Sequence, residues 1–164
     1  MPLQQYAYFA LTSTRTSARE MTAELGLEPD ETRVRGSRFT DPVIPVCHSW
    51  KVVCREPGLR VDEQIAHVLD RLRPHTDRIA ALARKLDREG PDPSAALHVV
   101  RCFNDVEDTD EACGPEGPNL FGWHLGRDVL DFLAATGAVV DVDEYDMSPD
   151  APEGDARTPA TPRR

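Results

Sequence analysis

Three arginines stand close together in the first third of the chain, at Arg33, Arg35 and Arg38. Guanidinium groups can hold a phosphate or a carboxylate through two parallel hydrogen bonds, so a loop that carries three of them is a candidate site for an anionic ligand. Trp50, on a strand predicted further along, would lie beside that ligand in this hypothesis. We otherwise expect Trp50 to be largely buried and to anchor its strand in the core. The alternative is a solvated loop in which the arginines pair with acidic neighbours. These neighbours are Glu28, Asp30, Glu31 and Asp41.

Cysteines and histidines offer nominal zinc ligands, but no tight C-x-x-C type of pair is present. The residues of these types are Cys47, His48, Cys54, His98, Cys102 and His124. His48 and Cys54 fall on one face of a predicted strand, where packing is the simpler interpretation. We expect His98, which shares its face with Val100 and Cys102, to be a hydrogen-bonded core histidine. We therefore expect reduced thiols, no metal and no cofactor.

A third group of polar residues closes the last predicted strand, where Asp141, Asp143 and Tyr145 project from one side. Paired carboxylates could serve acid–base chemistry or bind a hard cation. The preferred interpretation is an edge strand whose outward charges prevent aggregation. The chain carries no glycine-rich phosphate-binding motif, no G-x-S-x-G and no Cys–His signature, so no catalytic residue is assigned.

The net charge of −10 is concentrated in two segments. Residues 105–118 carry six acids and no base, residues 141–164 carry seven acids and three bases, and all remaining charges cancel. Because nucleic-acid binding needs a basic face, we expect no nucleic-acid partner. No apolar run approaches the roughly 20 residues that span a membrane, and the N-terminus does not have the pattern of a secretion signal, so we expect a cytoplasmic protein.

The elements that must position these residues follow from hydrophobic periodicity. An aromatic-rich strand is predicted at 6–12. A helix follows, which a capping box of Ser17 and Glu20 begins and Gly26 ends. Residues 28–45 are predicted to form a polar loop.

The second half of the pattern starts with a strand at 46–55. An amphipathic segment at 61–88, capped by Asp62 and interrupted by Pro74, indicates two helices or one kinked helix. A third strand is predicted at 95–103.

After the acidic segment, the pattern indicates a short strand at 120–123. A helix at 126–136 then ends at Gly137, and the last strand covers 138–145.

The order strand, helix, strand occurs twice, at 6–55 and at 95–146. Two such split βαβ units build a ferredoxin-like sandwich, an α+β fold, with the helices at 61–88 as an insertion between them. We expect a single domain at 1–147. The segment 148–164 is rich in proline and charge and poor in large apolar residues, so we expect it to be a disordered tail.

Several short motifs occur in a characteristic order. They are Glu24-Leu25-Gly26-Leu27-Glu28-Pro29, Arg35-Gly36, Trp50 on its strand, Leu69-Asp70-Arg71-Leu72, Thr136-Gly137-Ala138 and Val142-Asp143-Glu144-Tyr145. In this order they resemble the bacterial domain-of-unknown-function family numbered 4279, over about residues 5–146. The resemblance implies the fold and a cytoplasmic bacterial setting, and it supplies no active site.

Together these features favour a non-catalytic protein-binding module of the immunity or adaptor type. Its partner would be recognised through the sheet face or the acidic segment, since a strongly acidic surface can attract a basic protein. The alternative is a binding protein for an anionic small molecule, or an enzyme, that uses the arginine loop. The oligomeric state is left open.

Overall fold

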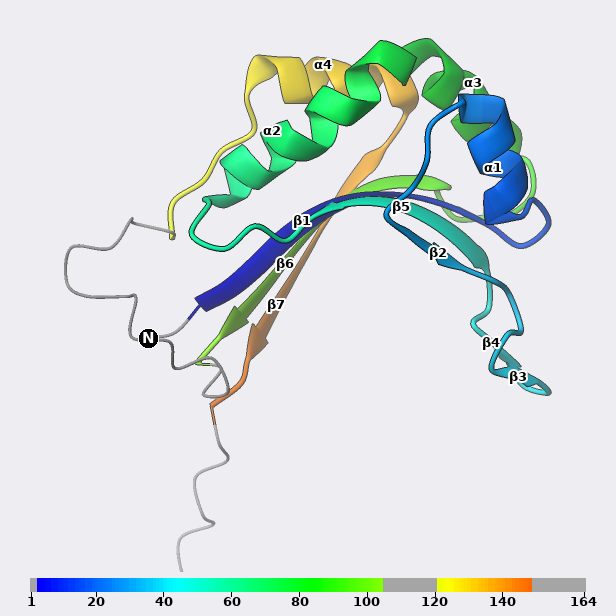
Figure 1. Cartoon of the computed structure of the whole chain (residues 1–164), viewed down its shortest axis with the longest axis horizontal. Helices are drawn as coiled ribbons and strands as arrows, with labels where there is room; N and C mark the ends of the chain where they lie inside the picture. The colour runs from blue at the N-terminus through cyan, green and yellow to red at the C-terminus, as the bar shows by residue number, and fades with distance from the viewer. Residues whose placement is uncertain (1–2, 105–120, 149–164) are drawn as a thin grey trace, which may run out of the picture.

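The computed structural model describes residues 3–104 and 121–148. A five-stranded sheet forms one layer, and all the helices of the described residues pack on one of its faces (Figure 1). The predictions for the acidic segment at 105–118 and for a disordered tail from 149 onward lie outside the described residues.

The sheet has the order β2-β5-β1-β6-β7. Its strands are β1 (Leu3–Ser13), β2 (Glu31–Arg33), β5 (His48–Cys54), β6 (Ala95–Phe103) and β7 (Val139–Asp146). The central strand β1 runs antiparallel to both β5 and β6, and β7 runs parallel to β6 at one edge. At the other edge the short strand β2 pairs antiparallel with β5.

The helices form where the apolar periodicity predicts them. They are α1 (Ala18–Leu25), α2 (Val61–Leu72), α3 (Thr76–Leu86) and α4 (Arg127–Thr136). Pro74 lies in a short 3-10 helix, η1 (Arg73–His75), which separates α2 from α3. The two-helix interpretation of the segment 61–88 is therefore confirmed, because proline cannot donate the backbone hydrogen bond of a continuous helix.

Most of the predicted helix ends are also confirmed. The Ser17 and Glu20 side chains form the capping box of α1, and Gly26 and Gly137 end α1 and α4 in the left-handed conformation, with φ of 67° and 69°. The predicted cap of α2 is wrong. Glu63, not Asp62, reaches back to accept the backbone N–H of the residue before the helix, at 2.7 Å.

Two predictions about irregular segments need correction. The supposed loop at 28–45 contains β2 and a small hairpin of β3 (Phe39–Thr40) and β4 (Val43–Ile44). Strand β2 forms because it satisfies the free backbone groups along the edge of β5. Within the described residues 121–126 there is no strand, so the short strand predicted at 120–123 is absent from that part.

The α+β class is confirmed, but the strand order is not that of two split βαβ units. In such units a strand of the other unit separates each pair, whereas here β5 lies directly beside β1 and β7 directly beside β6. Helix α4 connects two adjacent parallel strands. The long connection after α1 instead returns the chain antiparallel to β1, which needs no crossover.

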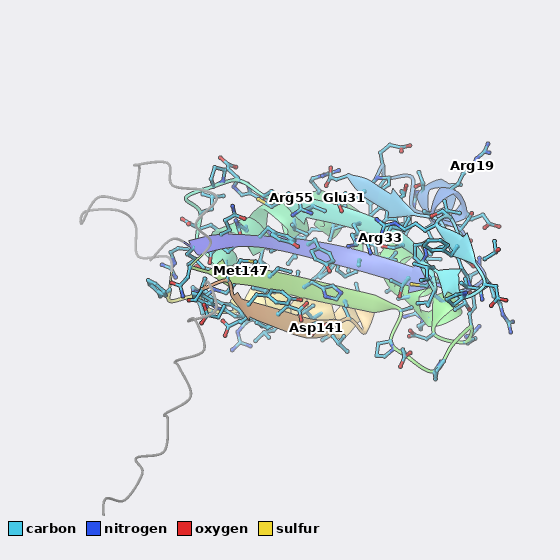
Figure 2. All side chains as sticks on the ribbon, turned by 90° about the horizontal axis from the view of Figure 1, so that it is seen from below. Arg19, Glu31, Arg33, Arg55, Asp141 and Met147 are labelled. Carbon is cyan, nitrogen blue, oxygen red and sulfur yellow. The ribbon has the colours of Figure 1, made fainter. Side chains whose placement is uncertain are left out.

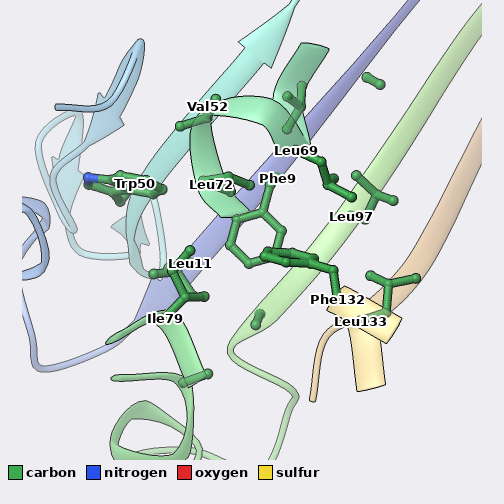
Figure 3. Close-up of a cluster of buried hydrophobic side chains, with 14 of the residues drawn as sticks. Phe9, Leu11, Trp50, Val52, Leu69, Leu72, Ile79, Leu97, Phe132 and Leu133 are labelled. Atoms are coloured by element: carbon green, nitrogen blue, oxygen red, sulfur yellow. The ribbon is translucent and has the colours of Figure 1, made fainter. Parts of the chain in front are cut away.

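The hydrophobic core fills the space between the sheet and the helices (Figure 3). Phe9 on β1 meets Phe132 on α4 edge to face, with ring centroids 5.6 Å apart. Trp50 on β5 is fully buried, and its indole N–H donates to the hydroxyl of Thr22 at 3.1 Å. The expectation that Trp50 is a core residue is confirmed. Among the described helices, none has the length and apolar character needed to cross a membrane.

Candidate functional site

The second face of the sheet is not covered by any described helix (Figures 1 and 2). Successive side chains of a strand point to opposite faces, so burial of Ala7, Phe9 and Leu11 against the helices turns Tyr6 and Tyr8 outward. We call this surface the open face. Its charged and aromatic side chains are Tyr6, Tyr8, Glu31, Arg33, Lys51, Arg55, His98, Asp141, Asp143 and Tyr145.

Stacked rings and cations form a continuous row across the middle of the open face. Tyr8 and His98 are paired directly across β1 and β6, and their rings stack with centroids 4.5 Å apart. On the β5 side, the Lys51 ammonium lies 4.1 Å from the centroid of the Tyr8 ring, and the Arg55 guanidinium lies 4.0 Å from that of Tyr6. These cation–π contacts hold the long basic side chains against the sheet.

Charge is divided between the two sides of the open face. Arg33 and Arg55 lie on the β2–β5 side, and Asp141 lies on the β7 side (Figure 2). The carboxylate of Glu31 binds the Arg55 guanidinium at 2.9 Å and so offsets one of the positive charges. A positive side, an aromatic centre and a negative side therefore follow one another across the sheet.

Burial shifts the pKa of three adjacent groups in the row. It lowers the pKa of Lys51, with a further lowering from the nearby Arg33 charge. It raises the pKa of Tyr8, to which Tyr6 adds. It also lowers the pKa of His98, although Asp141 opposes the shift, so the imidazole is neutral near pH 7. Groups that are partly desolvated in this way are common at functional sites.

His98 is not the hydrogen-bonded core histidine that the sequence suggested. It lies on the open face because it alternates with Leu97 and Val99, which point into the core. Its Nδ1 atom is shielded from solvent and has no hydrogen-bond partner among the described residues. The nearest carboxylate oxygen, Oδ2 of Asp141, lies 3.5 Å away.

Asp141 and Asp143 complete a cluster with His98. The parallel register places Asp141 beside His98 and Asp143 beside Val100, so all three side chains share one face. One ligand-type atom from each of His98, Asp141 and Asp143 lies within 4.8 Å of the others. The prediction that Asp141, Asp143 and Tyr145 project from one side of an edge strand is confirmed.

A second cluster lies at the opposite side of the sheet, where β5 ends. It brings together Cys54, Glu56 and His67, and the imidazole Nδ1 lies 3.5 Å from a Glu56 oxygen. A shallow cavity of about 420 Å³ adjoins it and is lined in part by Asp70 and Arg71. The sequence predicts Cys54 to be a packing residue and gives no signal for His67, because α2 brings this histidine to β5 only in the folded chain.

The arginine loop is arranged differently from the predicted anion site. Arg33 lies on the open face, whereas the side chain of Arg35 donates to the carbonyl oxygen of Val46 at 3.0 Å and Arg38 precedes the β3–β4 hairpin. Trp50 lies on the other face of the sheet with none of its surface exposed. The structure therefore does not bring Trp50 together with the three arginines.

The acidic neighbours of the loop pair elsewhere. Asp30 binds Arg71 on α2 at 2.6 Å, and Glu31 binds Arg55. The ion pairs of Asp30 and Glu31 are thus made with arginines outside the loop, and they do not support the interpretation that these two acids neutralise the loop arginines. Anion binding by Arg33, Arg35 and Arg38 stays a prediction.

Fold and site together define a class of α+β protein with helices on one face of a mixed five-stranded sheet and a mixture of charged and aromatic residues on the other. The chain belongs to the family described as Domain of unknown function (DUF4279), whose model matches residues 4–147. The resemblance noted in the sequence is thereby confirmed. Comparisons with curated proteins and with solved structures found no match.

Proposed function

We propose that this protein is a non-catalytic protein-binding module of the immunity or adaptor type, and that the open face is the surface that binds its partner. The observation that carries the proposal is the row of stacked rings and cations on an uncovered sheet face. Its backbone is held rigidly by pairing on both sides of β1 and by the core beneath it.

The composition of the open face suits protein recognition. Tyrosine and arginine are enriched among the residues that contribute most to protein–protein binding, because their large side chains bury much area with few rotatable bonds or with planar hydrogen bonding. Tyr6 and Tyr8 are partly exposed at its centre. Tyr8 and Lys51 are already partly removed from water by the sheet, and contact with a partner would bury them fully.

The division of charge indicates the chemistry of the partner. A partner that fits this face presents acidic side chains to Arg33 and Lys51, an apolar or aromatic group to Tyr8, and a basic group to the β7 aspartates. Complementary charges of this kind speed encounter and fix the orientation of the complex.

The test compares open-face variants with a matched control on the helical side. A partner is captured from the native host and identified, and its affinity is then measured by calorimetry for the wild type, Tyr8→Ala and Lys51→Glu. The control is Arg84→Ala, an exposed arginine on α3. We expect each open-face change to weaken binding about tenfold or more and the control to leave it unchanged.

Equal affinities for all four proteins would place the interface elsewhere and contradict the proposal. Failure to find any partner whose binding saturates would count against a binding module altogether. Circular dichroism of each variant checks that a loss of affinity does not come from a loss of fold.

The proposal includes a cytoplasmic, bacterial setting. Among the described residues, Cys47 and Cys54 are free thiols, which supports a reducing compartment. The anionic-ligand alternative is separated by titrating inorganic phosphate into the wild type and an Arg35→Ala variant. Saturable phosphate binding that this substitution abolishes would favour the alternative.

A further inference from the structure

We infer that His98, Asp141 and Asp143 form a binding site for one divalent first-row transition-metal ion, with Zn²⁺ the best match to the donor set. The three residues lie on adjacent parallel strands, and their ligand-type atoms lie within 4.8 Å of one another. The sequence predicts no metal here, because the histidine and the aspartates lie more than 40 residues apart in the chain and neither forms a tight ligand motif.

The spacing of the donors fits a shared ion. Two donors bound to one tetrahedral ion at about 2.1 Å lie about 3.4 Å apart. The Nδ1 of His98 and the Oδ2 of Asp141 lie 3.5 Å apart, a separation at which no hydrogen bond joins them. These two atoms therefore need almost no movement to bind the same ion.

The buried nitrogen of His98 is a second, independent observation. Polar atoms removed from water are nearly always satisfied by a partner, and Nδ1 has no hydrogen-bond partner among the described residues. A metal ion between His98 and Asp141 would satisfy this nitrogen. Because Nδ1 is shielded from solvent and lies 3.5 Å from the Oδ2 atom of Asp141, an ion shared with that carboxylate is the partner that fits its position.

The sheet holds the ligands in place before an ion binds. The His98 ring stacks on Tyr8 at an interplanar angle of 12°, which restricts its rotation. The β6–β7 register fixes the backbone positions of both aspartates. The imidazole and the two aspartate backbones therefore lose little freedom on binding, and only the aspartate side chains, of which that of Asp141 is 56% exposed, have still to be ordered.

The chemistry of the donors selects the class of ion. A neutral imidazole is a ligand for zinc and its neighbours in the transition series, whereas magnesium and calcium prefer oxygen donors alone. Three protein ligands leave at least one coordination position for water or for a side chain of another molecule. The inference does not rest on the proposed function, since the same atoms would bind the ion with no partner present.

The cluster of Cys54, Glu56 and His67 is a competing site that the experiment must distinguish. Its imidazole is 54% exposed, against 20% for that of His98, and would therefore lose more freedom on binding, whereas Glu56 at 60% and Asp141 at 56% are similarly exposed. A thiolate ligand would also reveal itself in the absorption spectrum of bound Co²⁺.

The experiment is a calorimetric titration of ZnCl₂ into the untagged full-length protein after removal of metal with a chelator. The variants are Asp141→Asn and Asp143→Asn, which keep the shape of the side chain. Asp131→Asn, an exposed aspartate on α4, removes the same charge far from the site. Cys54→Ser disables the competing cluster.

We expect the wild type to bind one Zn²⁺ per chain. Each substitution at 141 or 143 should weaken that binding about tenfold or more, while the Asp131 and Cys54 variants bind like the wild type. The Co²⁺ complex should lack the intense near-ultraviolet band of a cobalt–thiolate bond. The melting temperatures of the metal-free variants verify that the edge strand remains folded.

Three results would overturn the inference. They are the absence of any saturable heat, binding that the Asp141 and Asp143 variants retain in full, and a cobalt–thiolate band that disappears in the Cys54 variant. The last result would assign the ion to the competing cluster. None of these results bears on whether Tyr8 and Lys51 contact a protein partner, so the proposed function is tested separately.

Discussion

Replacement of Trp50 by alanine distinguishes the two roles that the sequence allowed for this residue, a ligand contact and a core anchor. The side chain is fully buried on β5 and hydrogen-bonded to Thr22. A tryptophan side chain buries about 200 Å², which at about 25 cal/mol per Å² corresponds to about 5 kcal/mol. Since the alanine methyl group retains about 1 kcal/mol of this, the net loss is about 4 kcal/mol, within the range for large-to-small changes in cores.

The expected result is therefore a large fall in stability. For a chain of this length, about 4 kcal/mol corresponds to a melting temperature lower by about 8 to 16 °C. Urea denaturation followed by far-ultraviolet circular dichroism measures the free energy of unfolding without relying on the fluorescence of the residue that is removed. Val46→Ala is the control, because the Val46 side chain is 70% exposed and should change stability by no more than about 0.5 kcal/mol.

A Trp50→Ala variant whose free energy of unfolding lies within about 1 kcal/mol of the wild-type value would refute this reasoning, because a cavity of that size in a close-packed core destabilises the fold by more. If such a variant also lost phosphate binding, Trp50 would be a ligand contact, and the buried position would not describe the protein in solution.

Two further predictions concern the segments that join the helices to the sheet. Burial alone would raise the pKa of Asp30, but hydrogen bonds from Arg71 and from the backbone N–H of Val53 hold it below its ordinary value. The ionised Asp30 carboxylate therefore stabilises the folded state fully above about pH 5, and this stabilisation is lost as the pH falls through the folded-state pKa. The difference in the free energy of unfolding between the wild type and Asp30→Asn should accordingly shrink between about pH 6 and about pH 2. A difference that does not change with pH would contradict this. Ser17→Ala removes the side chain that caps α1 and should lower the free energy of unfolding by about 1 kcal/mol in urea, whereas no measurable loss would show that the cap is not needed.

Elements of the fold could be predicted from the sequence wherever local signals decide them. The capping box and Gly26 delimit α1, Pro74 separates α2 from α3, and alternating residues mark β6 over the range that was predicted. The order of the strands could not be predicted in the same way. Whether β5 lies beside β1 or one strand away depends on pairing between residues that are distant in the sequence. A periodic hydrophobic pattern contains no information about such pairing.

The candidate site shows the same limit. Asp141 and Asp143 could be placed on one side of a strand from their spacing, and His98 on a face with Val100. Their meeting depends on two facts that spacing does not contain, namely that β7 is the neighbour of β6 and that it pairs in the register that sets Asp141 beside His98. Whether Trp50 is buried or exposed depends likewise on which face of β5 the helices cover.

The two faces of the sheet are linked by the alternation of side chains along each strand. Leu97 and Val99 point into the core, and this fixes His98 on the open face between them. Helix α4, which leads directly into β7, packs Val129, Phe132 and Leu133 into the same core. A shift of β7 by one residue along β6 would turn the β7 aspartates away from His98 and would also require α4 to leave its packing position. The apolar contacts of α4 therefore maintain the geometry of the charged cluster on the opposite face, so changes to this part of the core should disturb metal binding on the open face even though no core residue touches the ion.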